Sequence, residues 1–166
     1  MGHEVRILGI DPGLRHTGWG MIISDGPRLS HVAHGVIKPD PNLPLADRLG
    51  VIYRDVSALI VEHRPELGSV EETLVNAGPQ SALKLGQARG AAMTALAMAA
   101  LEVAEFAPRR IKQAIVGTGK ADKEQIAFMV RRLLPRAGEV KDDAADALAC
   151  AICAAHHAKP RLKGVA

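Results

Sequence analysis

The chain has 166 residues, 48% of them apolar, and 21 basic against 18 acidic side chains, which gives a formal net charge of +3. This length fits one domain with an ample hydrophobic core, and no apolar stretch approaches the roughly 20 residues of a membrane-spanning helix. We therefore exclude a membrane protein, and because no secretory signal precedes the first strand pattern, we expect a cytoplasmic location. The spacing of Cys150 and Cys153 within a helical pattern excludes a disulfide scaffold and predicts small buried residues.

The first part of the chain predicts an antiparallel meander. Residues 5–11 are apolar and rich in β-branched side chains, which indicates a buried strand. Residues 18–24 and 29–37 predict the next two strands, with a hairpin-like loop at 25–28 between them. After a proline-punctuated loop, apolar residues recur at helical spacing through residues 45–62, which predicts an amphipathic helix.

The second part alternates strands and helices. Residues 67–73 predict a strand that returns to the sheet through a crossover connection. The remaining predicted elements are a long apolar helix at 80–103, a strand at 103–107, and helices at 109–116, 123–134 and 142–157. The pattern predicts an α/β fold with a mixed five-stranded sheet, in which three antiparallel strands are followed by parallel ones, and helices cover both faces. We expect one domain over residues 1–158 and a short, basic, flexible tail at 159–166.

Carboxylates in three separate segments are the strongest chemical signal. Asp11 ends the first strand, so its side chain lies at the carboxyl edge of the sheet, where open α/β sheets bind ligands. Asp143 and Asp146 are three residues apart and share one face of the last helix. The apolar neighbours of Asp146 predict burial, and a buried charge needs a partner or an ion. In the fourth strand, alternation sends Glu71 and Glu72 to opposite faces, so either one of them can join Asp11.

Such a cluster predicts a site for hard divalent cations. Gathered carboxylates repel one another and require compensating cations, and Mg²⁺ or Mn²⁺ accepts oxygen ligands while retaining waters. Two such ions about 3.5–4 Å apart activate a water and stabilise the leaving oxygen of an in-line displacement. Setting aside four acids as ligands leaves 21 basic and 14 acidic side chains, and this balance of +7 favours a polyanionic partner. The sequence therefore indicates metal-assisted phosphodiester chemistry.

Motifs along nearly the whole chain resemble one known family. The most specific are Leu-Gly-Gln-Ala-Arg-Gly at 85–90 and Asp-Ala-Ala-Asp-Ala-Leu at 143–148. They are similar to those of the RuvC family of Holliday junction resolvases, which has the ribonuclease H-like fold. The other matching segments, in the same order as in the family, are residues 7–20, 70–73, 81–90, 111–113 and 116–117.

The resemblance implies an endodeoxyribonuclease of recombination and repair. It assigns the catalytic and metal-binding acids to Asp11, Glu71, Asp143 and Asp146, and so favours Glu71 over Glu72. It implies a homodimer that binds a four-way DNA junction and nicks two strands symmetrically with two Mg²⁺ ions per site, for which Mn²⁺ can substitute. The nicks leave 5′-phosphate and 3′-hydroxyl ends. A further implied partner is the branch-migration helicase complex of the Ruv system.

The resemblance also implies DNA contacts. Lys112 and Lys123 match basic residues near the scissile phosphate, and Lys84 and Arg89 belong to the DNA-facing helix region. Leu74 stands where related proteins usually carry an aromatic residue that stacks on a junction base. Leucine can wedge between bases but lacks a π-face worth ~1–3 kcal/mol per stacked base, so we expect weaker distortion of the junction centre. Phosphate contacts should then dominate the affinity.

Other classes of protein fit the sequence less well. An actin-like or sugar-kinase site needs two such domains, and the apparent phosphate loop near 116–121 lacks its first glycine at Ala114 and its Ser or Thr at Ala121. A non-catalytic DNA-binding module remains an alternative, although a negative pocket would hinder it. A nuclease of the same fold that cuts RNA is the closer rival. The alanine-rich helix is a candidate for the dimer contact, and simple core burial explains it equally well.

Overall fold

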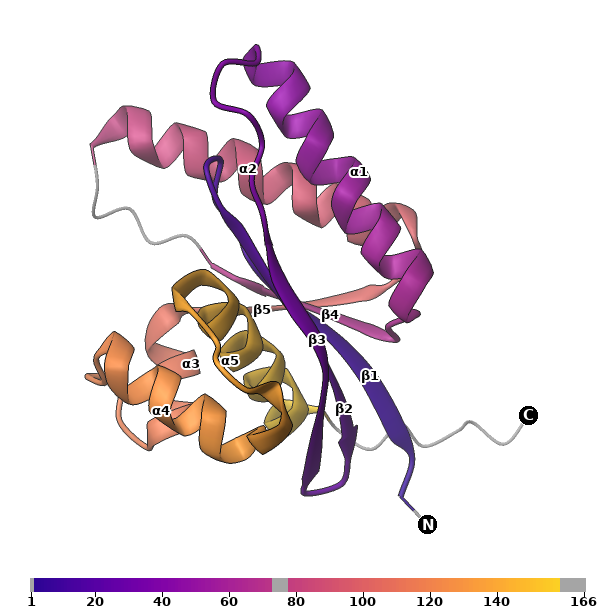
Figure 1. Cartoon of the computed structure of the whole chain (residues 1–166), viewed down its shortest axis with the longest axis vertical. Coiled ribbons are helices and arrows are strands. Elements are labelled where there is room, and N and C mark those ends of the chain that lie inside the picture. The colour runs from indigo at the N-terminus through magenta and orange to yellow at the C-terminus, as the bar shows by residue number, and fades with distance from the viewer. Residues whose placement is uncertain (1, 73–77, 159–166) are drawn as a thin grey trace.

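The protein is built on a single mixed sheet with the strand order β3-β2-β1-β4-β5 (Figure 1). The computed structural model describes residues 2–72 and 78–158, so Leu74 and the basic tail lie outside the described residues. The strands are β1 (Glu4–Asp11), β2 (Thr17–Asp25), β3 (Arg28–Ile37), β4 (Leu67–Glu71) and β5 (Glu102–Phe106). β2 pairs antiparallel with β1 and β3, whereas β1, β4 and β5 are parallel neighbours. The predicted sheet is confirmed.

Helices cover both faces of this sheet. Figure 1 shows α1 and α2 on one side and α3, α4 and α5 on the other. The helices are α1 (Leu45–His63), α2 (Pro79–Met98), α3 (Pro108–Val116), α4 (Lys123–Leu133) and α5 (Asp142–His157), and a short 3₁₀ helix, η1 (Pro135–Ala137), precedes α5. None of the helices among the described residues is long and apolar enough to cross a bilayer.

Alternation along β1 divides the core into two layers. Leu8 and Ile10 pack toward α1 and α2, whereas Ile7 packs toward α5. These side chains are fully buried, as expected for a strand with helices on both of its faces. Cys150 and Cys153 of α5 are free and buried in the second layer, which confirms their prediction as core residues.

Two glycines allow α5 to lie directly on the sheet. Gly9 of β1 and Gly20 of β2 are paired in register. A Cβ atom at Gly9 would lie 2.1 Å from the backbone oxygen of Ala147, and one at Gly20 would lie 2.4 Å from a methyl carbon of Leu148. Any larger residue at either position would push the helix away. The helix that carries two of the predicted acids is therefore held against the strand that carries a third.

The end of the alanine-rich helix differs from the prediction. The pattern predicts a helix over 80–103, but α2 ends at Met98 and β5 begins at Glu102. Ala100 has a left-handed backbone with φ of 57°, which ends the helix. Because alanine is the strongest helix former, this run contains no stop signal. Leu83 and Met98 of α2 are 63% and 73% exposed, so the single chain leaves part of this helix uncovered.

Candidate active site

Asp11 lies at the carboxyl end of β1, on the face that α5 covers. It shares this face with Gly9, because side chains two residues apart on a strand point to the same side. Asp11 pairs with Gly18 of β2, and a Cβ atom at Gly18 would lie 2.0 Å from the backbone oxygen of Asp143. The first turn of α5 thus sits over the position beside Asp11. This close approach brings Asp11 and Asp143 together.

Glu71 ends β4 on the same side of the sheet. Two residues earlier, the buried hydroxyl of Ser69 donates a hydrogen bond of 2.8 Å to the backbone oxygen of Cys150, one turn beyond Asp146 on α5. The face of β4 that carries Ser69 and Glu71 is therefore the face on α5. Glu72 follows the strand and is exposed. This geometry brings Glu71, and not Glu72, to the other acids.

Burial and mutual repulsion raise the pKa values of three acids. Desolvation is the largest cause for Asp11, whose pKa is raised to about 9, and the charge of Glu71 is the next largest. Desolvation also raises the pKa values of Glu71 and Asp146. A hydrogen bond joins the carboxyl groups of Asp11 and Glu71, and it raises the pKa of Asp11 and lowers that of Glu71. Asp143 adds a further repulsive charge.

Two of the predicted DNA-contacting lysines lie beside this cluster. Lys112 is on α3 and Lys123 is the first residue of α4. The charges of both lysines lower the pKa values of Glu71 and Asp146, against the larger effect of desolvation. They offset part of the negative charge and stand where a phosphate that approaches the acids would meet them.

The four acids provide an oxygen-only donor set, but their side chains do not form a finished metal centre. Within residues 2–72 and 78–158, no three His, Cys, Asp or Glu side chains are placed as a metal-ligand cluster. The raised pKa of Asp11 reflects a repulsion among the acids that a bound cation would relieve. Carboxylate oxygens in this setting suit a hard divalent cation, so the donor chemistry fits Mg²⁺ or Mn²⁺.

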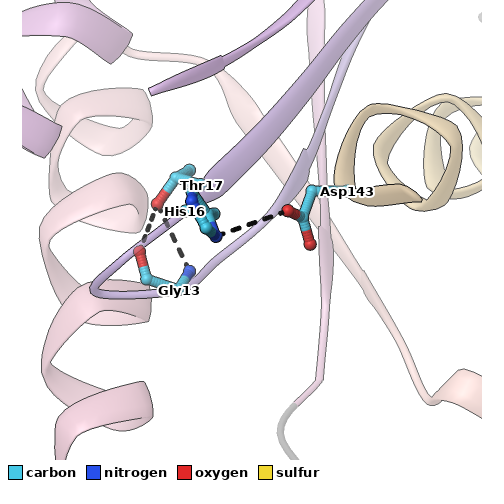
Figure 2. Close-up of polar contacts among 4 residues, drawn as sticks. All are labelled: Gly13, His16, Thr17 and Asp143. Atoms are coloured by element: carbon cyan, nitrogen blue, oxygen red, sulfur yellow. Dashed lines mark hydrogen bonds and ion pairs between the residues drawn. The ribbon is translucent and has the colours of Figure 1, made fainter. Parts of the chain in front are cut away.

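His16 lies beside the acids and was missed by the sequence reasoning. Its Nδ1 atom is 3.9 Å from Oδ2 of Asp143. Figure 2 shows the two side chains pointing toward one another. The loop that carries His16 is braced, because the Thr17 hydroxyl donates a hydrogen bond of 2.7 Å to the backbone oxygen of Gly13 (Figure 2). No local sequence signal marks His16, because its contact with Asp143 depends on how α5 packs on the sheet.

The remaining predicted DNA contacts have different surroundings. The Arg89 side chain donates a hydrogen bond of 3.1 Å to the backbone oxygen of Glu71 and forms an ion pair with Glu105 of β5. Arg89 thus holds the ends of β4 and β5, a role that its prediction as a DNA contact did not include. Lys84 is exposed on α2, and no contact in the described part of the chain joins it to the acids. Leu74 lies outside the described residues.

Comparison with known proteins identifies the family of the chain. The family model described as Crossover junction endodeoxyribonuclease RuvC matches residues 7–154. The chain belongs to the RuvC family. The RuvC protein of Hyphomonas neptunium is 67% identical over 163 residues, which cover 98% of each chain. The RuvC protein of Caulobacter vibrioides is 55% identical over 147 residues, which cover 89% of this chain and 87% of that protein.

Solved structures of the RuvC family share the fold. Thermus thermophilus RuvC superposes with a TM-score of 0.82 at 34% identity, covering 92% of this chain and 94% of that chain. The same protein in complex with a Holliday junction substrate superposes with a TM-score of 0.85 over the same shares of both chains. The yeast mitochondrial resolvase Ydc2, at 14% identity and a TM-score of 0.68, shares the fold alone.

Proposed function

We propose that this protein is a structure-specific endodeoxyribonuclease that resolves four-way DNA junctions in recombination and repair, by metal-dependent hydrolysis with Mg²⁺ as the cation. The observation that carries the proposal is the convergence of acids from β1, β4 and α5 at one edge of the sheet. Membership of the RuvC family and the likeness to a junction-bound relative support it. The protein would act in the cytoplasm, where bacterial DNA lies.

The proposed roles follow from the positions of the acids. Asp11, Glu71, Asp143 and Asp146 would hold the ions through carboxylate oxygens, with Asp11 losing its proton on loading. Two bound ions would supply Lewis acidity and an activated water at the scissile phosphate. Lys112 and Lys123 would attract and orient the phosphate, because they already lower the pKa values of the neighbouring acids. Arg89 would keep the β4 end in place through the backbone of Glu71.

Paired cutting requires two such sites. We infer a homodimer that nicks two strands of like polarity and leaves 5′-phosphate and 3′-hydroxyl ends, and a branch-migration helicase complex as the partner that positions the junction. A non-catalytic binding module is disfavoured, because gathered acids would repel DNA unless they bind cations.

The Asp11→Asn variant tests the catalytic assignment. It removes a metal ligand without changing shape, so junction binding and folding should persist. Nicking should fall by roughly 10³-fold or more, because metal charge stabilisation is worth several kcal/mol. The measurement is single-turnover cleavage of a synthetic four-way junction, a plain duplex and a structured RNA in Mg²⁺. Undiminished nicking by Asp11→Asn would refute its role, and equal cutting of all three substrates by the wild-type protein would refute junction specificity.

A further inference from the structure

A basic cavity lies next to the acids, on the side away from Lys112 and Lys123. It has a volume of about 390 Å³, and it opens between the β1–β2 loop and the segment that follows β3. The residues that line it are Arg15, His16, Lys38, Pro39, Asp40 and Pro41. Arg15 and His16 lie within the matching segment 7–20, but the resemblance assigns the metal ligands and the DNA contacts to other residues.

The sheet register brings the two segments of the cavity together. Thr17 of β2 pairs with Ile37 at the end of β3, so the next position outward sets His16 opposite Lys38. Arg15 precedes His16 in the same loop. The guanidinium of Arg48 on α1 donates a hydrogen bond of 3.4 Å to the backbone oxygen of Leu14, which supports this loop from the other side. The cavity wall is thus organised before any ligand arrives, which lowers the entropic cost of binding.

The charges of the cavity favour an anion. Arg15 and Lys38 are exposed, and neither makes an ion pair with any residue in the described parts of the chain. The only acid in the lining, Asp40, accepts a hydrogen bond of 2.9 Å from the backbone N–H of Asn42, so part of its charge is engaged. Unpaired arginine and lysine side chains around one hollow suit a phosphate, because arginine can bind two of its oxygens at once.

The cavity lies directly beside the catalytic acids proposed above. His16 touches both the cavity and Asp143, so the two sites share a wall. Across the sheet, Lys38 follows β3 at one edge, the acids follow β1 and β4 in the middle, and Lys112 lies on the helix after β5 at the other edge. A DNA strand laid along this edge would meet positive charge, then the acids, then positive charge again.

We propose that this cavity binds a backbone phosphate of the cleaved DNA strand, one or two nucleotides from the scissile phosphate. The proposal rests on the proposed nuclease function and adds a second anchor to it. Arg15 and Lys38 hold this phosphate, and His16 forms the boundary with the catalytic acids. Holding the strand on both sides of the acids fixes the scissile phosphate over them, which contributes to the rate through orientation.

A cycle of protein and DNA changes tests the proposal. The protein variant is Arg15→Ala/Lys38→Ala, which leaves His16 and the acids intact. In the DNA, one phosphate at a time within three nucleotides of the cut is replaced by an uncharged methylphosphonate. Junction affinity is measured in EDTA, where no cutting occurs, and nicking is measured separately in Mg²⁺.

One DNA position should respond to both changes. The methylphosphonate there should weaken wild-type binding roughly tenfold, but should weaken binding by the variant less than about twofold, because the partner charges are already gone. For the unmodified junction, the plot of log affinity against log salt concentration should also be shallower for the variant than for the wild type. The difference in slope should be about 0.9, because the variant loses one phosphate contact. Additive effects at every position would overturn the proposal.

Controls separate the cavity from the enzyme as a whole. Arg28→Ala removes a charge at the opposite end of β3, roughly 30 Å away by strand rise. Each methylphosphonate should weaken junction binding by this variant as much as it weakens binding by the wild type. Wild-type nicking of the unmodified junction tests the proposed function independently, since the binding cycle in EDTA does not depend on it. An equal effect of Arg28→Ala would show general charge attraction and would also overturn the proposal.

Discussion

Asp11 is the residue on which the environment of the site acts most strongly. Its carboxyl group is desolvated and faces three other acids, and its pKa of about 9 reflects both facts. Between the ordinary value of 3.8 and 9, the folded metal-free protein holds a proton that the unfolded chain has released. Stability from this group is therefore present at low pH and is lost as pH rises through that window. Metal binding should reverse the trend, because it replaces the proton.

The pH dependence of unfolding checks this reasoning. In EDTA, the melting temperature of Asp11→Asn should gain on that of the wild type as pH rises from about 5 to 8, because asparagine has no proton to lose. Near pH 8, added Mg²⁺ should raise the melting temperature of the wild type and not that of Asp11→Asn, because the variant lacks a metal ligand. Thermal unfolding by circular dichroism gives both values. A constant gap across this range would show that Asp11 ionises freely in the folded protein.

The decisive contact between elements is that of α5 with β1 and β2. Gly18 lies beside Asp11 in the sheet and beneath the backbone of Asp143. The first turn of α5 can lie this close to β2 only because Gly18 has no side chain. A glycine-to-alanine change here acts on stability and on the site at once.

Two matched substitutions test this contact. Gly18→Ala should destabilise the fold by roughly 1–3 kcal/mol, because the added carbon meets a backbone oxygen that cannot move without the helix. Nicking should fall even at temperatures where the variant is folded. Gly50→Ala on α1, where a Cβ atom would meet only the movable guanidinium end of the Arg54 side chain, should instead stabilise by about 0.5–1 kcal/mol. Urea titration measures both, and a neutral Gly18→Ala would contradict the proposed close packing.

Much of the fold and of the acid cluster follows from local pattern. Strand alternation and helical spacing predict the sheet and α5, because those elements have apolar faces of clear period. Choosing between Glu71 and Glu72 requires knowing which face of β4 meets α5, and that depends on the Ser69 contact across the core. The contact of His16 with Asp143 and the use of Arg89 as a strand clamp depend on tertiary neighbours as well. No local pattern encodes these.

At the scale of the whole molecule, the outer surface of α2 is a candidate face for a second copy. Leu83 is 63% exposed there, and glycines at 86 and 90 leave open space beside it. Small residues let two helices approach closely, and a paired-nick mechanism requires two protomers. We therefore expect α2 to lie at the dimer interface.

Charge placed on this face should separate the protomers. Leu83→Arg should weaken dimerisation at least roughly tenfold, because it puts a charge at the centre of an apolar contact. Phe128→Arg on α4, where the side chain is 52% exposed, is the control and should leave the dimer intact. Sedimentation velocity over a concentration series measures both. Equal behaviour of the two variants would exclude α2 as the interface.

The order of elements along the chain has a consequence for biosynthesis. α5 is the last described element to leave the ribosome, yet it lies at the centre of one layer of the core and brings two of the four acids. Until it emerges, the nascent chain has an apolar sheet face without its cover and lacks Asp143 and Asp146. We therefore expect translation to deliver the nuclease in an inert form, with activity beginning only when the final helix docks.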